Sequence, residues 1–95
     1  MTAYELVDEV RKRPDHYLRG DRSLRQLHAI MVGYELGATR GIFSDFRPFN
    51  RWLSRKFGLP EASGWFNMVN SQADMDEKAY DLFFELLDQF RSGTK

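Results

Sequence analysis

Two groups of charged residues in this chain have spacings that could support chemistry, one acidic and one basic. The acidic group comprises Asp74, Asp76, Glu77, Asp81, Glu85 and Asp88. Its last three members are three or four residues apart, which places them on one face of a helix, and none has a basic residue four positions later. Acid–base catalysis by such carboxylates would need a pocket, and the segment lacks the oxygen ligands and central glycine of a calcium loop. We therefore expect a solvated acidic ridge that contacts a basic protein partner.

The basic group precedes the acidic group in the chain. Arg47, Arg51 and Arg55 recur every four residues, Lys56 joins them, and Trp52 borders them. This pattern could follow a phosphate backbone. The formal net charge of the chain is zero, however, and the acidic ridge offers these arginines an internal counterpart. Nucleic-acid binding is therefore the alternative prediction for this group, and binding of a protein is the main one.

Residues typical of catalytic or metal centres are few. His16 and His28 are the only histidines, cysteine is absent, and neither histidine has neighbouring ligands at the spacing of a zinc site. Ser23, Ser44 and Ser63 stand where helix N-caps are expected, which already accounts for them. The sequence predicts a protein that is not an enzyme and that uses no metal and no cofactor.

Length and composition predict one folded domain over residues 1–95. The chain is 15% aromatic, which supplies a large buried area for its size, and no segment alternates polar and apolar residues as a strand does. The lack of cysteine favours a cytoplasmic location, and no apolar run approaches the roughly 18 residues of a membrane span. We expect a compact all-α domain of about five helices, without a membrane segment.

Charge is distributed unevenly along the chain. Residues 11–56 contain eleven Lys and Arg against four acids, whereas residues 57–95 contain seven acids against three bases. Either these two parts attract each other in the folded chain, or one of them faces a charged partner.

The elements that must position these groups can be placed from caps and periodicity. Helices are expected over residues 3–13, from a Thr2/Glu5 capping box, and over residues 24–39 after Ser23, with a structured loop over residues 14–22. Gly33 in the second helix, with Gly37, predicts the close approach of another helix.

Three further helices are expected after residue 44. The third begins after a cap at Ser44 or Asp45, tolerates Pro48 in its first turn and ends at Gly58. A short helix follows over residues 63–73, and the last helix covers residues 78–91 with Asp74 as its N-cap. The apolar stripe of the last helix comprises Ala79, Phe83, Leu86, Leu87 and Phe90, widened by Tyr80 and Phe84. So wide a stripe predicts that this helix packs against two or more neighbours.

Short motifs spread over most of the chain are shared with one group of small proteins. They are Arg-Pro-x-x-Tyr-Leu (13–18), Ser-Leu (23–24), Gly-Tyr-Glu (33–35), Phe-Asn-x-Trp-Leu (49–53), Gly-Trp-x-Asn-Met (64–68) and Phe-Phe-Glu-Leu-Leu-Asp-x-Phe-Arg (83–91). In these motifs the chain resembles small helical bacterial proteins, some of which are similar to immunity proteins of polymorphic or contact-dependent growth inhibition toxin systems. The resemblance implies a cognate toxin as partner and carries over no catalytic residue.

The residues and the resemblance together predict a non-catalytic domain that neutralises a cognate toxin by stoichiometric binding. Many toxins of that kind are basic nucleases, as the resemblance implies, and the acidic ridge would then occupy the groove meant for phosphate. Two alternatives stay open. One is a small nucleic-acid-binding regulator that uses the arginines of the basic group, and the other is a helical adaptor that uses an apolar patch.

Overall fold

The computed structural model describes residues 2–18, 22–37 and 45–93, with side chains left out at 35–37. The elements are α1 (Ala3–Lys12), α2 (Pro14–Tyr17), α3 (Leu24–Gly37), α4 (Arg47–Phe57), the 3-10 helix η2 (Glu61–Ser63), α5 (Trp65–Ser71) and α6 (Asp76–Arg91). No strand occurs in these ranges, so the all-α prediction is confirmed.

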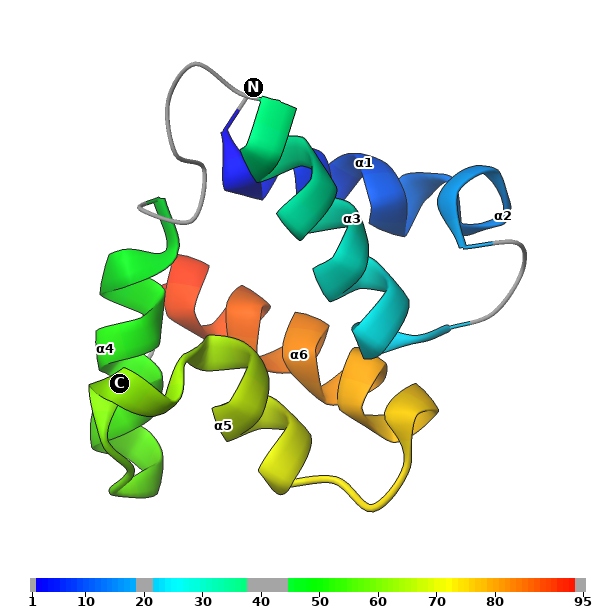
Figure 1. Ribbon diagram of the computed structural model, residues 1–95. Coiled ribbons are helices and arrows are strands. Elements are labelled where there is room, and N and C mark those ends of the chain that lie inside the picture. Colours follow the sequence, from blue (N-terminus) through cyan, green and yellow to red (C-terminus); the bar gives the residue numbers. More distant parts are fainter. Residues whose placement is uncertain (1, 19–21, 38–44, 94–95) are drawn as a thin grey trace.

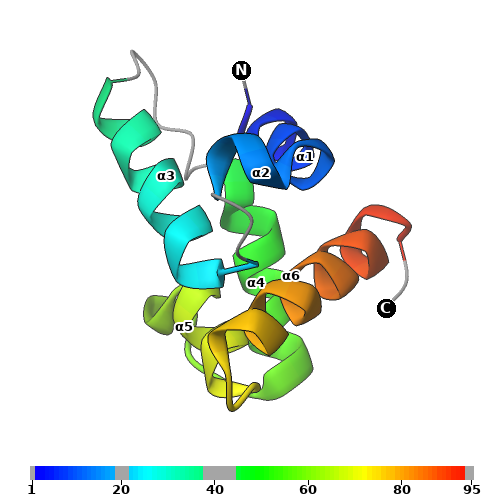
Figure 2. The same ribbon diagram turned by 90° about the vertical axis from the view of Figure 1, so that its right-hand side faces the viewer.

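Helix α6 lies at the centre of the arrangement. In Figure 1 it crosses the molecule with α1 and α3 above it and α4 and α5 below, and in Figure 2 it passes in front of α4. It contacts α3, α4 and α5 directly, while α1 packs against α2 and α3. The prediction that its wide apolar stripe needs several neighbours is therefore confirmed.

The buried side of α6 holds the core together. Ala79, Phe83, Leu86 and Leu87 are buried as the periodicity predicts, and Tyr80 and Phe84 are buried beside them. The Phe83 ring is fully buried and lies 5.0 Å from the Trp65 ring, 5.9 Å from Phe49 and 6.1 Å from Phe46, measured between centroids. One aromatic cluster thus joins α6 to α4 and α5.

The start of α1 is closed by two sets of hydrogen bonds. The predicted capping box is present, because the Glu5 N–H donates to Thr2 Oγ1 at 3.1 Å and the Thr2 N–H donates to Glu5 Oε1 at 3.0 Å. In addition, the Ala3 N–H donates to Asp45 Oδ2 and the Tyr4 hydroxyl donates to the Asp45 carbonyl, both at 3.0 Å. Residue 45 therefore holds the first turn of α1.

This use of Asp45 corrects a prediction about α4. The N-cap of α4 is Phe46, without a side-chain hydrogen bond, and the other expected cap, Ser44, lies outside the described residues. Pro48 stands in the first turn, and Gly58 ends the helix with φ of 65°, both as predicted. Asp45 failed as a cap because it faces α1, which is remote in sequence.

Four other local predictions were wrong. Residues 14–17 form α2 rather than a loop, although Leu18 is buried as expected. Helix α5 begins after Gly64, at φ of 83°, instead of at Ser63, and the N-cap of α6 is Met75 instead of Asp74. A Cβ atom added to Gly33 would meet no atom of another described helix within 4 Å, so none of these helices approaches it closely. The expected end of α3 at residue 39, and the surroundings of Gly37, lie outside the described residues.

Candidate functional site

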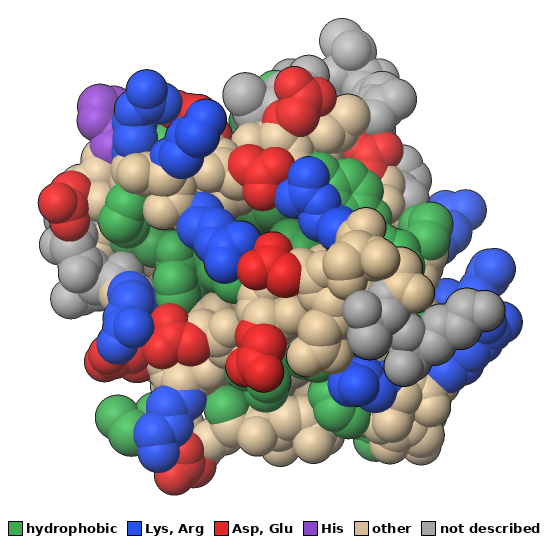
Figure 3. All heavy atoms as spheres, turned by 180° about the vertical axis from the view of Figure 1, so that it is seen from behind, with side chains coloured by type: hydrophobic (Ala, Val, Ile, Leu, Met, Phe, Trp, Pro, Cys, Tyr) green, Lys and Arg blue, Asp and Glu red, His purple; other side chains and the backbone are tan. Residues whose placement is uncertain are grey.

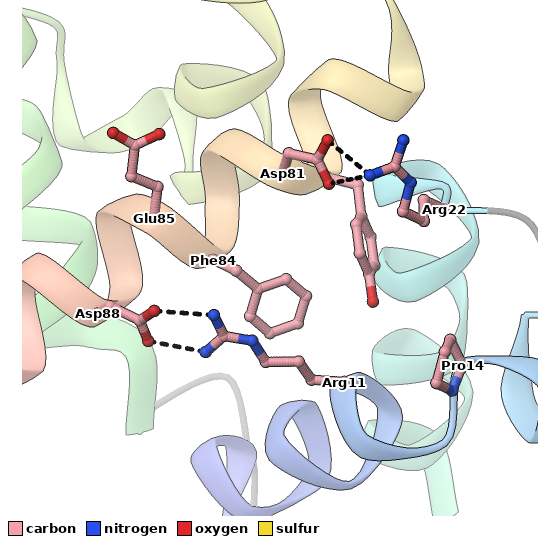
Figure 4. Close-up of a pocket in the computed structure, with 8 residues that line it drawn as sticks. Arg11, Pro14, Arg22, Asp81, Phe84, Glu85 and Asp88 are labelled. Atoms are coloured by element: carbon pink, nitrogen blue, oxygen red, sulfur yellow. Dashed lines mark hydrogen bonds and ion pairs between the residues drawn. The ribbon is translucent and has the colours of Figure 1, made fainter.

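A shallow groove of about 410 Å³ runs along the outer side of α6, and we call it the α6 groove (Figure 4). It is lined by Arg11, Pro14, Arg22, Tyr80, Asp81, Phe84, Glu85 and Asp88. Five of these residues come from α6, whereas Arg11 belongs to α1, Pro14 to α2 and Arg22 to the segment just before α3. Charged side chains of both signs are interleaved on the face that Figure 3 shows.

Arg11 closes one end of the groove. Its two terminal nitrogens donate to the two carboxylate oxygens of Asp88, each at 2.9 Å, and its guanidinium lies 4.9 Å from the centre of the Phe84 ring. The geometry is bidentate, with a cation–π contact behind it. The hydrogen bonds from Arg11 lower the pKa of Asp88 and raise the pKa of Arg11, so both groups stay charged.

Arg22 closes the other end. It donates to both oxygens of Asp81, at 3.0 and 3.2 Å, and to Glu77. The hydrogen bond to Glu77, followed by the charge of Asp81, raises the pKa of Arg22. One guanidinium thus bridges two carboxylates that are four residues apart on α6 and compensates the charge of one of them.

Glu85 lines the same groove but is not neutralised in this way. Its side chain is exposed and makes no ion pair or hydrogen bond with any residue that the structure describes. In Figure 4 its carboxylate points away from both guanidiniums. Counted with Glu77 at its edge, the groove has four carboxylates against two guanidiniums, which is an excess of two negative charges among the described residues.

The other two members of the predicted acidic site, Asp74 and Asp76, lie beside the start of α6, and each bonds to a group within the fold. Asp76 accepts hydrogen bonds from the Ser23 hydroxyl and, at 3.0 Å, from the Arg25 N–H, so it helps to cap α3. Ser23 itself caps α3 as predicted, accepting from the Gln26 N–H. Asp74 forms an ion pair with Lys78, its neighbour one turn later. The structure thus separates this predicted set into Asp74 and Asp76 outside the groove, Glu77 at its edge, and the three acids that line it.

The basic group of α4 does not pair with the acids of α6, which corrects the expected internal counterpart. Arg51 pairs with Glu61 at 3.5 Å, and the Lys56 ammonium lies 5.3 Å from the centre of the Trp52 ring. Arg47 and Arg55 are exposed and make no side-chain ion pair or hydrogen bond within the described ranges. The counterparts of the acidic ridge are instead Arg11 and Arg22, from the base-rich part of the chain. Attraction between the two parts of the chain, one of the two readings of the charge pattern, is thus present.

The predicted site did not include five of the residues that line the groove, namely Arg11, Pro14, Arg22, Tyr80 and Phe84. For the two arginines the only signal was the excess of bases in residues 11–56, which does not say which base faces α6. The two aromatic residues were read as core, and they are indeed buried, at 5% and 4% exposure, beneath the charged rim.

Neither histidine belongs to the groove. The His28 ring stacks on Phe66 with centroids 4.3 Å apart, and burial lowers the pKa of His28. The His16 ring meets the Tyr17 ring edge-on. Within the described ranges, no three side chains of His, Asp or Glu converge as a metal site would require.

The described helices include none that is both long and apolar enough to cross a membrane. Comparison of the chain with protein-family models, with curated proteins and with solved structures found no match.

Proposed function

We propose that this protein binds a basic protein partner stoichiometrically through the α6 groove, and that it acts as an immunity protein that neutralises a cognate toxin. Binding to a basic partner is supported by the charge of this exposed groove, which has an excess of two negative charges. Two of its carboxylates, those of Asp88 and Asp81, are held in place by Arg11 and Arg22. The toxin as partner rests on the family resemblance of the sequence motifs. The lack of cysteine favours the cytoplasm as the place of action.

The geometry suits charge-based recognition. Tyr80 and Phe84 line the groove but are almost fully buried, so the exposed groups that a partner meets first are the charged side chains around them. Exposed charges of this kind mainly accelerate encounter with an oppositely charged partner and orient it, and they add less to the lifetime of the complex. Arg11 and Arg22 restrict the positions of Asp88 and Asp81, which reduces the side-chain ordering that binding requires.

The helical adaptor receives less support. Among the described residues, the exposed large apolar side chains are Val32, Tyr34 and Met75. Val32 and Tyr34 are two residues apart on α3, so they point to different sides of that helix. Single exposed apolar residues are ordinary on a protein surface.

Glu85 allows the cleanest test of the groove, because its replacement breaks no ion pair within the described residues. The candidate partner is the product of the neighbouring gene. It is co-expressed and co-purified with this chain to test binding. It is also expressed without the chain to test whether it arrests growth. We expect Glu85→Lys to keep the fold, with a slightly higher melting temperature because it replaces repulsion from Asp81 and Asp88 by attraction, and to slow association with that partner by about tenfold or more at low salt. The matched control is Glu61→Lys, which makes the same charge change on η2, outside the groove, and should leave association unchanged. Protection and association by Glu85→Lys equal to those of the wild type would refute the groove as the interface.

A further inference from the structure

The exposed side of α4 carries four cations, and we call it the α4 basic face: Arg47, Arg51, Arg55 and Lys56. An α-helix rises about 1.5 Å per residue, so the three arginines are spaced at intervals of roughly 6 Å along the helix. In Figure 3, blue side chains gather at the right-hand edge, the side on which α4 lies.

This face is largely unneutralised. Its one ion pair to a described residue joins Arg51 to Glu61, and α4 itself contains no acidic residue. The acids of α6 that might have compensated it are bound to Arg11 and Arg22 instead. Four cations against one carboxylate leave an excess of three positive charges.

Repulsion among these cations opposes the stability of α4, although Arg55 and Lys56, in its last turn, are favourably placed for the helix dipole. Arginines four residues apart on a helix repel each other, and a positive charge in the first turn, where Arg47 stands, opposes the helix dipole. Helix α4 is held instead by Phe49 and Leu53, which are fully buried. Arg47 and Arg55 have no ion-pair partner among the described residues, which leaves both guanidiniums available to an external anion.

The groups next to the arginines indicate what kind of anion fits. A row of guanidiniums one turn apart suits an extended polyanion, because each can bind a phosphate through two nitrogens. The Trp52 ring is only half exposed, and Lys56 lies over it, so it offers no free platform on which a base could stack. The amide of Asn50 donates to the Glu61 carbonyl at 3.0 Å, so it is not free to read the edge of a base.

We propose that the α4 basic face binds the phosphate backbone of nucleic acid without reading its base sequence. Arg47, Arg51 and Arg55 make the phosphate contacts, and Lys56 adds charge beside them. This surface is separate from the α6 groove, so the proposal stands or falls independently of the toxin partner.

The test is fluorescence anisotropy with two labelled probes, an oligothymidylate of about 20 nucleotides and a mixed-sequence DNA duplex of similar length, each longer than one expected site. With three phosphate contacts on a single strand, raising the salt from about 50 to 200 mM should weaken binding roughly 20-fold, and somewhat more on a duplex. Comparison of the two probes shows whether the α4 basic face binds the backbone of a single strand or of a duplex.

The decisive variant replaces Arg47, Arg51 and Arg55 together with Gln. It should still fold, because it removes repulsion, and circular dichroism with a thermal melt checks this. Its affinity for the preferred probe should fall at least about tenfold, with a shallower dependence on salt. The matched control replaces Lys12, Arg13 and Arg25 with Gln, which removes the same charge from α1, the α1–α2 junction and α3. This control should bind within about twofold of the wild type, and so should Glu85→Lys, which alters the groove alone.

Three results would each overturn the proposal. The first is no binding of either probe at low salt. The second is an equal loss of affinity in the control triple variant, which would show that binding follows total charge. The third is binding of poly-glutamate as tight as that of the oligonucleotides, which would assign the face to an acidic protein.

Discussion

The α6 groove and the α4 basic face contain charged residues at the same helical spacing, yet they relate to the fold in opposite ways. In the groove, Asp81 and Asp88 each hold an arginine from another part of the chain, at distances of 2.9 to 3.2 Å. On α4, Arg47 and Arg55 form no ion pair with a described residue, and Arg51 forms one, with Glu61 at 3.5 Å. The comparison teaches that a row of like charges on a helix indicates exposure, while the neighbours of that helix decide whether the row joins elements or faces solvent.

The largest effect should come from the core that carries both surfaces. Phe83→Ala removes a fully buried ring that joins α6 to Phe46, Phe49 and Trp65, so the free energy of unfolding should fall by about 3 to 5 kcal/mol. Urea denaturation followed by circular dichroism measures it. Leu82→Ala, on the half-buried side of the same helix, is the control and should cost clearly less. If Phe83→Ala lowered the free energy of unfolding no more than Leu82→Ala does, the cluster around Phe83 would not be the core that supports both surfaces.

A smaller effect should separate paired from unpaired arginines. Arg11→Met keeps much of the apolar stem but loses the bidentate pair with Asp88 and the contact with Phe84. Because both partners are about half exposed, solvent screening limits the loss to about 1 kcal/mol. Arg55→Met, made on the α4 basic face, should leave the urea midpoint unchanged. Equal losses in the two variants would remove the distinction between the two regions.

The groove should also show a pH signature that the α4 face lacks. Arg11 lowers the pKa of Asp88 in the folded state below its ordinary value of 3.8, so the pair stabilises the fold fully above that value. The stabilisation is lost as pH falls from about 4 through the lower, folded-state pKa, because Asp88 then becomes protonated. Asp88→Asn should therefore be less stable than wild type at pH 6, and the difference should vanish in strong acid. A difference that stays constant with pH would show that the ion pair is not its cause.

The smallest effect should be a gain. Arg47→Glu removes repulsion from Arg51, creates an attractive pair one turn apart and places a negative charge in the first turn of α4, so stability should rise by about 0.5 kcal/mol. The urea midpoint measures this, and Arg47→Gln should give an intermediate value. A loss of stability in Arg47→Glu would show that Arg47 has a partner within the fold.

Periodicity and caps predicted the helices well because they depend on neighbours in sequence. The buried stripe of α6, the capping box at Thr2 and the end of α4 at Gly58 are all local features, and all were correct. Asp45 and Asp76 were misread because each bonds to a backbone N–H far away in sequence, at Ala3 and at Arg25. No local pattern marks such a bond.

The candidate site was predicted in part for the same reason. The spacing of Asp81, Glu85 and Asp88 was enough to place them on one exposed face, but not to show that Arg11 and Arg22 face them. The sequence analysis expected these acids to contact a basic partner and named the arginines of α4 as their internal counterpart, because those arginines form a row of opposite charge. Spacing along one helix carries no information about which other helix lies beside it, so the pairing had to come from the tertiary structure.

The bonds that fix α1 also set an order of events during synthesis. The first turn of α1 is completed by Asp45, and its outer side is tied to α6 by the Arg11–Asp88 and Asp8–Arg91 ion pairs. A ribosome that adds residues from the N-terminus onward has therefore made α1 long before its partners exist. Until residue 91 has left the exit tunnel, this helix lacks its ion-pair partners on α6, and a helix of ten residues is marginal on its own in water. The α1 segment should consequently reach its full resistance to protease only after α6 has emerged, although it precedes α6 in the chain.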